Sequence, residues 1–255
     1  MFEKIIYYSG INYLYKKLFQ RPHIICVGYH SVRPEALAEV PYSHLVVNTR
    51  DFENQLEYLK NSGYKFISIK DLKSLKRIDD KYILVYFDDG FKDVVDYALP
   101  ILKKYEIRGT VFVVTDYTSG KSNPWNEKNT FMTWGDIREN LNNLDFQSHT
   151  VSHRKLSKLD EEDIMKELTL PREVIMKETG EEVFAISYPH SSFNKRIQEL
   201  AIEQDYDITI GNGRGLNFDL GKHLKKIPTS KMSNINDFKV RTGILYLLNN
   251  TIKRK

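Results

Sequence analysis

Two clusters of residues have the types and the spacing of a metal-dependent hydrolytic site. Asp88 and Asp89 end an apolar run and precede Gly90, and His149 and His153 follow some sixty residues later. One carboxylate and two imidazoles make three protein ligands, the set that a catalytic zinc uses while its fourth position stays open for water. The second aspartate is then free to act as a base.

Each cluster alone is weak evidence, because Asp-Asp-Gly is commonly a turn and two histidines four apart are commonly surface residues. Together they complete each other. Adjacent carboxylates without a cation repel, and a divalent ion between Asp89 and the histidines removes that conflict. On a helical turn, His149 and His153 would point from one face toward one ion. Zinc suits these ligands best, and nickel, cobalt or iron accept the same set.

The elements that must position these residues are strands and helices in alternation, which is typical of a parallel sheet with crossover helices. Strands are expected at 24–29, 65–69, 82–87, 110–115, 144–148, 183–188 and 206–210. Helices are expected at about 52–60, 92–105, 133–142 and 160–178, the last with a kink or a division at Pro171. This pattern favours an α/β fold, a distorted or incomplete (β/α) barrel with about seven parallel strands. Asp88, Asp89 and His149 would then lie at the carboxyl ends of strands, where barrel enzymes hold their active sites.

The composition fits a single catalytic domain over 1–255, with helical segments at about 1–20 and 236–255. A net charge of +4 is too small to indicate nucleic-acid binding. Cys26 is the only cysteine, so no intrachain disulfide can form. We find no signal peptide or transmembrane segment and expect a cytoplasmic protein. The terminal segments mix aromatic residues with lysines, which allows peripheral contact with the inner membrane, although packing on the barrel exterior is the simpler interpretation.

The stretch 86–91, Tyr-Phe-Asp-Asp-Gly-Phe, resembles the first motif of the polysaccharide deacetylases with NodB homology, and 148–153 resembles their second. Further similarity, at 28–32, 52–72, 109–113 and 132–134, covers most of the chain. The resemblance implies a distorted barrel and a metal-dependent hydrolase that removes N-acetyl or related acyl groups from amino sugars. It also implies Asp88 as the base and Asp89, His149 and His153 as the metal ligands.

The segment 187–191 occupies the place of the third motif. Tyr188, Pro189 and His190 are therefore candidate substrate-binding residues, and the backbone N–H of His190 falls where the resemblance expects a donor to the oxyanion. Many members carry an arginine ahead of the proline that pairs with the base, and its absence here leaves the orientation and the pKa of Asp88 open. Trp125, in a polar loop at 116–130, could stack on a sugar ring or anchor the loop.

The proton donor to the leaving amine is the least defined residue. We find no clear counterpart of the late Leu-x-His motif that supplies it in many relatives, and His223 is the only histidine in that part of the chain. Lysines on both sides of it, Lys226 among them, favour a solvated turn there. His30, at the end of the first strand, and His190 are the competing candidates.

The expected location limits the substrate, because a protein that is not exported does not readily meet finished cell-wall polymer. Nucleotide-linked or lipid-linked sugars are then the accessible precursors of a bacterial surface glycan. Two other functions share the same residues. One is a deformylase or another carbon–nitrogen hydrolase of the same fold, and the other is a glycan-binding protein that keeps the site but has lost turnover. The sequence does not indicate an oligomeric state.

Overall fold

The structure is a computed structural model that describes residues 21–128, 130–211, 213, 215–229 and 234–243. The helical segment predicted at 1–20 lies outside the described residues, as does most of the one predicted at 236–255. Within the described residues, α10 (Ile235–Arg241) occupies the start of the second segment.

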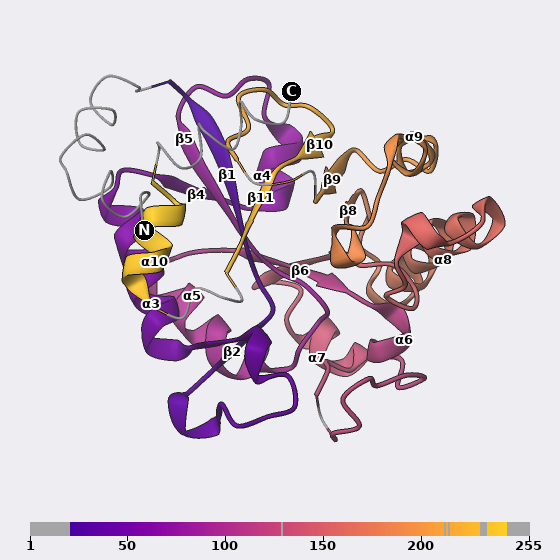
Figure 1. Cartoon of the computed structure of the whole chain (residues 1–255), viewed down its shortest axis with the longest axis horizontal. Coiled ribbons are helices and arrows are strands. Elements are labelled where there is room, and N and C mark those ends of the chain that lie inside the picture. The colour runs from indigo at the N-terminus through magenta and orange to yellow at the C-terminus, as the bar shows by residue number, and fades with distance from the viewer. Residues whose placement is uncertain (1–20, 129, 212, 214, 230–233, 244–255) are drawn as a thin grey trace.

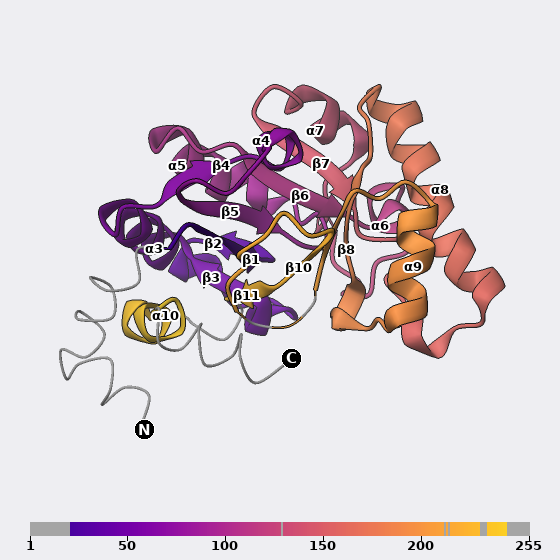
Figure 2. The ribbon, with the colours of Figure 1, turned by 90° about the horizontal axis from the view of Figure 1, so that it is seen from above.

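A parallel sheet lies at the centre of the molecule, and helices surround it (Figures 1 and 2). The strands run in the order β10-β9-β8-β7-β6-β5-β1-β11, with β4 also paired to β5. They are β1 (His23–Tyr29), β4 (Lys65–Ile67), β5 (Lys81–Phe87), β6 (Gly109–Val113), β7 (Leu144–Ser148), β8 (Ala185–Ser187), β9 (Ile208–Ile210), β10 (His223–Leu224) and β11 (Lys226–Pro228). All seven predicted strands are present, and the predicted α/β barrel is confirmed.

Two strands that the sequence did not reveal, β10 and β11, come from consecutive stretches of chain but pair with opposite ends of the sheet. β10 pairs with β9, and β11 pairs with β1. Asn217 holds the crossing between them, because its side chain accepts from the N–H of Lys225 at 2.8 Å and donates to the carbonyl of Lys225 at 3.1 Å. This short segment brings the two ends of the sheet together, and each strand is too short to show a period in the sequence.

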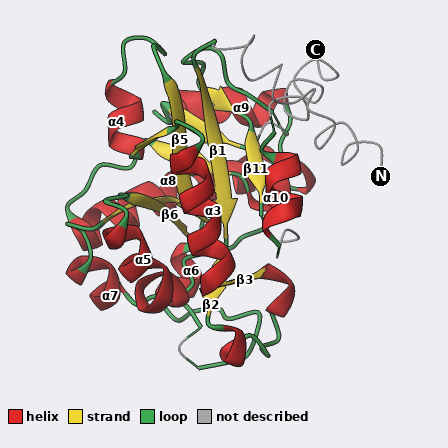
Figure 3. Cartoon of the chain, turned by 90° about the vertical axis from the view of Figure 1, so that its left-hand side faces the viewer, coloured by secondary structure: helices red, strands yellow, loops and turns green. Residues whose placement is uncertain are grey.

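Helices cover the outside of the sheet, and a small separate sheet pairs β2 (Ser31–Arg33) with β3 (Val46–Asn48) (Figure 3). The helices are α3 (Thr49–Asn61), α4 (Ile69–Ser74), α5 (Leu99–Lys104), α6 (Thr115–Thr118), α7 (Trp134–Glu139), α8 (Glu161–Thr179), α9 (Lys195–Glu203) and α10. A π-helical turn, η3 (Val94–Ala98), precedes α5, and 3-10 turns are η1 (Glu35–Leu37), η2 (Ser43–Leu45), η4 (Leu156–Lys158) and η5 (Pro189–Ser191). In the described part of the chain, no helix has the length and apolar character needed to span a bilayer.

The longest helix, α8, runs through Pro171 as one element, so of the two predicted outcomes, a kink or a division, the division is wrong. Asp160 caps its start by accepting from the N–H of Asp163, and it ends at Gly180, whose φ of 73° is left-handed. A proline removes one i to i−4 hydrogen bond, here the bond to the carbonyl of Glu167. Pro171 is buried, on the same face of α8 as Glu167, Leu168 and Ile175.

Side chains alternate between the inside of the barrel and the layer between strands and helices. Cys26, Tyr86 and Phe112 belong to the inner group, whereas Val27 and Phe87 belong to the outer one. Burial raises the pKa of the Cys26 thiol to about 12, as expected for a small apolar core residue. Gly28 is required beside Tyr86, since a Cβ atom there would lie 2.2 Å from the tyrosine hydroxyl. The same alternation directs residue 88 toward the mouth of the barrel.

Candidate metal centre

Asp88 and Asp89 follow the carboxyl end of β5 in a sharp turn. The N–H of Asp88 donates to the carbonyl of Tyr29 at 2.9 Å, which holds the turn against the end of β1. Asp89 and Gly90 both have left-handed backbones, with φ values of 72° and 80°. This conformation is unfavourable for residues other than glycine. At Asp89 it turns the chain so that two successive carboxylates face the same cavity.

His149 directly follows β7, and the neighbouring strand fixes its tautomer. Its Nδ1–H donates to the carbonyl of Ser187 in β8 at 2.6 Å. The lone pair of Nε2 is then available to a ligand, in the arrangement common for histidines that bind metals. This Nε2 atom lies 3.3 Å from Oδ1 of Asp89.

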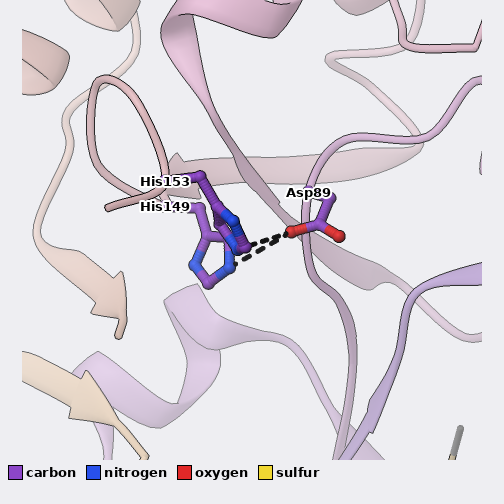
Figure 4. Close-up of side chains that lie close together, drawn as sticks. All are labelled: Asp89, His149 and His153. Atoms are coloured by element: carbon purple, nitrogen blue, oxygen red, sulfur yellow. Dashed lines mark ion pairs between the residues drawn. The ribbon is translucent and has the colours of Figure 1, made fainter. Parts of the chain in front are cut away.

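His153 reaches the same point from a loop rather than from a helix. The predicted helical turn is wrong, because residues 149–153 form no helix and Thr150 and His153 have φ values of 70° and 60°. These left-handed residues fold the loop back on itself. The Nε2 atom of His153 therefore lies 3.2 Å from the same Asp89 oxygen, and the rings of His149 and His153 are 5.0 Å apart (Figure 4).

The three donor atoms have the separation of ligands on one tetrahedral ion. One ligand atom each from Asp89, His149 and His153 all lie within 4.8 Å of one another. Zinc bonds of about 2.0–2.1 Å place two ligands of a tetrahedral site roughly 3.3 Å apart, which matches the two distances measured to Asp89. Oδ1 of Asp89 is buried and has no hydrogen-bond partner among the described residues. Burial of a carboxylate oxygen without a hydrogen bond is costly, so these residues fit a divalent cation.

The charges around this point are strongly coupled. Burial alone would raise the pKa of Asp89, but the imidazoles of His149 and His153 hold it well below its ordinary value. Burial would likewise raise the pKa of Asp88, but His149, Lys226 and His30 lower it. Both carboxylates are therefore ionised, as a metal ligand and a general base require.

Lys226 places a cation beside Asp88, the residue for which the sequence showed no arginine partner. Its Nζ lies 3.6 Å from Oδ2 of Asp88, and its side chain is only 12% exposed. The register of β11 on β1 pairs Lys226 with Cys26, so both face the inside of the barrel. The solvated turn predicted for this lysine is wrong. The sequence did not reveal the contact because it depends on a three-residue strand.

A cavity of about 590 Å³ opens above the metal ligands. It is lined by His30, His44, Leu45, Asp88, Asp89, Tyr117, Pro124, Trp125, His149, His153, His190, Ser191, Lys226 and Pro228. Of the predicted site residues outside the metal cluster, Asp88, His190 and Trp125 line this cavity. The ring of His190 lies 4.5 Å from that of His153, and Trp125 packs on Tyr42 and His44. His44 and Tyr117 were not selected from the sequence, since no motif marks either residue.

Three predicted site residues are not among those that line the cavity. Tyr188 is fully buried and stacks on Phe193 at 5.1 Å, and Pro189 is buried in η5. His223 is exposed on β10, and its Nδ1 lies 2.8 Å from the hydroxyl of Thr209. His30 lines the cavity instead, and its Nδ1 is buried with no hydrogen-bond partner in the described part of the chain.

Strained backbone gathers around the same cavity. Of the eight non-glycine residues with positive φ in the described part of the chain, Asp89, Thr150, His153, His190 and Ser191 belong to the site. Such conformations persist only where the surrounding structure enforces them, and they gather at functional sites.

The description "Polysaccharide deacetylase" belongs to the family model that matches residues 76–209, more than half of the chain. The protein is a member of the polysaccharide deacetylase family. The matched region contains Asp88 and the three residues of the metal cluster, Asp89, His149 and His153.

Two curated relatives are similar over part of their length. YxkH of Bacillus subtilis, by name a candidate polysaccharide deacetylase, is 24% identical over 71% of this chain and 62% of its own length. A poly-beta-1,6-N-acetyl-D-glucosamine N-deacetylase of Staphylococcus aureus is 27% identical over 58% of this chain and 54% of its own length. The chain thus spans about three fifths and just over half of the lengths of these relatives.

Solved structures share the fold. The deacetylase PplD of Streptococcus pyogenes, in complex with acetate, is 24% identical and has a TM-score of 0.70 over 90% of this chain and 98% of that chain. IcaB from Ammonifex degensii is 18% identical and has a TM-score of 0.69 over 89% and 98%. At these identities the likeness shows that the barrel is the same.

Proposed function

We propose that this protein is a metal-dependent hydrolase that removes N-acetyl groups from the amino sugars of a bacterial glycan. One observation carries the proposal. Three possible metal-binding atoms converge at ligand spacing beside the ion pair of Asp88 and Lys226, in a chain of the polysaccharide deacetylase family. A divalent ion held by Asp89, His149 and His153, with zinc the best fit, would polarise the amide carbonyl and increase the acidity of a bound water.

Asp88 is the proposed base that takes a proton from the attacking water. Its Oδ1 atom is buried and has no hydrogen-bond partner among the described residues, so it is available to accept one. Lys226 orients the carboxylate through Oδ2 and, together with His149, favours its ionised form. The backbone N–H of His190, in the strained turn η5, is the proposed donor to the oxygen that gains charge.

His30 is the proposed donor of the proton that the departing amine requires. It lies at the end of β1, next to the strand that carries Asp88, and it lines the cavity. Burial lowers the pKa of His30, and the carboxylates of Asp89 and Asp88 act in the opposite direction. His223 is less suitable for this role, because it is hydrogen-bonded to Thr209 and does not line the cavity. A His30→Gln variant should keep its metal and lose most of its turnover.

The substrate class is an N-acylated amino-sugar glycan. The name of the Staphylococcus relative supports a polymer of N-acetylglucosamine. A cytoplasmic location, expected from the sequence, would instead favour a nucleotide-linked or lipid-linked precursor. The aromatic and basic terminal segments of the sequence would add peripheral contact with the inner membrane, and flotation of the protein with anionic liposomes would test it.

The test is acetate release by metal-loaded protein from a panel of acetylated substrates. The panel contains poly-β-1,6-N-acetylglucosamine oligomers, a nucleotide-linked N-acetyl sugar and an N-formyl sugar of the same scaffold. Acetate from one of the first two supports the proposal and identifies the substrate form. Formate from the third would favour a deformylase. Bound glycan without any release of acid would favour a binding protein that has lost turnover.

A further inference from the structure

The loop at 149–153 contains two of the three proposed metal ligands, and its backbone amides are all hydrogen-bonded. His149 donates to the carbonyl of Val113 at 2.9 Å, and Thr150 and His153 bond to side chains within the same short stretch, Ser148 and Thr150. The two amides in the middle of the loop have no such local partner. Their hydrogen bonds come from a residue on a different element.

That residue is Glu167, which reaches the loop from the middle of α8. Its Oε2 accepts from the N–H of Val151 at 2.9 Å and from the N–H of Ser152 at 3.0 Å. Its Oε1 accepts from the hydroxyl of Ser152 and from Nε of Arg154 at 3.2 Å. The side chain of Glu167 is only 3% exposed, so a buried carboxylate is committed to one loop.

Two carbonyl groups of the loop are also hydrogen-bonded, to a different helix. The carbonyls of Thr150 and Val151 accept from the N–H groups of Thr115 and Asp116, at 3.3 and 3.0 Å. The loop is thus held between the start of α6 and a carboxylate on α8. Because Thr150 and His153 have left-handed backbones, the loop would relax to a different shape without these bonds.

We propose that Glu167 is a positioning residue for metal binding, which holds the histidine loop in the shape that brings His153 and His149 to one ion. The proposal rests on the metal site described above. Val151 and Ser152 lie between the two histidines, so a shift of their amides changes the separation of the two imidazoles directly. Outer partners of metal ligands affect affinity by this route, and their loss typically costs about 10- to 100-fold in metal affinity.

The contacts of Glu167 also require a carboxylate rather than an amide, because both of its oxygens accept hydrogen bonds. A glutamine at this position could still accept the two backbone N–H bonds through its single oxygen. Its NH₂ group could not accept from Arg154, and it would face the guanidinium as a second donor. Glu167→Gln should therefore be milder than Glu167→Ala, which removes every bond to the loop.

The experiment measures zinc affinity in metal-free, full-length protein by competition with a chromophoric chelator, in the absence of substrate. Glu162→Gln is the matched control, because Glu162 lies on the same helix, is exposed and pairs only with Lys166 among the contacts described for it. We expect about 10-fold weaker binding for Glu167→Gln and about 100-fold for Glu167→Ala. The control should bind as the unchanged protein does. The thermal midpoint of metal-free Glu167→Gln should stay close to that of the unchanged protein, while the increase caused by zinc becomes smaller.

The outcomes separate this inference from the proposed function. If the unchanged protein binds one zinc and folded Glu167→Gln binds it equally well, Glu167 has no positioning role and the metal site stands. Equal loss of thermal stability with and without zinc, at unchanged affinity, would assign Glu167 to the fold alone and overturn the inference. If the unchanged protein binds no divalent metal, both proposals fail. Should Glu167→Ala not fold, the glutamine variant alone decides.

Discussion

Buried carboxylates lie at both ends of the barrel strands, and their partners differ. At the amino end, Asp145 at the start of β7 accepts from Nε of Arg108 at 2.7 Å, and Lys70 lies 3.7 Å away. The same guanidinium also donates to the carbonyls of Leu141 and Asn142. At the carboxyl end, Asp89 meets two imidazole nitrogens at 3.2 and 3.3 Å and makes no hydrogen bond with the described residues.

The pair at the amino end is suited to stabilise the fold, whereas the group around Asp89 at the carboxyl end is suited to bind a metal ion. A guanidinium is always charged, so Arg108 supplies the counter-charge of Asp145 at the amino end, although Oδ2 of Asp145 is buried without a hydrogen-bond partner among the described residues. The imidazole of His149, held by its Nδ1 atom, presents the lone pair of Nε2 to the same oxygen of Asp89 that His153 approaches, so a cation completes the group at the carboxyl end. Backbone strain is concentrated at the site, where five of the eight left-handed non-glycine residues of the described chain lie, whereas Glu106 and Asp205 precede β6 and β9 at the amino end.

Removal of a metal ligand at the carboxyl end should have the largest effect. His149→Ala takes away one of three ligands and the bond to Ser187 that orients it. We expect its zinc affinity to fall by more than about 100-fold and its deacetylase activity to fall to background. Elemental analysis of the dialysed protein, with circular dichroism to confirm folding, checks this. Stoichiometric zinc in this variant would show that the ion binds elsewhere.

Replacement of the proposed base should separate turnover from metal binding. Asp88→Asn keeps the shape of the side chain but cannot take up a proton, so we expect about 10³-fold slower turnover with one metal still bound. Acetate release and metal content measured on the same sample test both parts. Near-normal turnover in this variant would remove Asp88 from the proposed mechanism.

Lys226→Met should have a smaller, pH-dependent effect. Asp88 acts in its ionised form, and Lys226 is one of the groups that lower its pKa. Without the lysine, the pKa of Asp88 rises, so the acid limb of the kcat/KM profile should move to higher pH by about one unit. Lys226→Arg should restore the profile, and Lys222→Met, which changes an exposed residue, should leave it unaltered. An unshifted limb in Lys226→Met would mean that this lysine does not tune the base.

A change at the amino end should affect stability and not catalysis. Arg108→Met leaves the carboxylate of Asp145 buried without its main partner. We expect the free energy of unfolding to fall by about 2–3 kcal/mol, at the low end for a broken buried pair because the arginine is partly exposed. Zinc affinity and turnover per folded molecule should be unchanged. Urea denaturation and the acetate assay measure the two effects, and a loss of turnover would contradict the division between the ends.

Residues that follow long strands could be located from the sequence. Asp88 and Asp89 follow seven residues of β5, and His149 follows β7, so strand ends and motifs agree on their position. Parallel strands bring their carboxyl ends to one edge, which makes the meeting of these residues predictable. The bounds of α8 were equally visible, because the helix predicted at 160–178 is observed at Glu161–Thr179 and helix ends depend on local chemistry.

The contacts that complete the site depend on tertiary structure. Lys226 faces Asp88 only because a three-residue strand pairs with β1, and Glu167 reaches the histidine loop only because α8 packs beside it. Neither residue belongs to a motif. The non-helical histidine loop was missed for a similar reason, since left-handed backbones at Thr150 and His153 are enforced by their surroundings and not by residue type.

The most direct test is anomalous diffraction at the zinc absorption edge from crystals grown with zinc. We predict one strong peak per chain, bonded to an oxygen of Asp89 and to the Nε2 atoms of His149 and His153. Zinc absent from this point in a well-ordered site, or bound through other residues, would contradict the account.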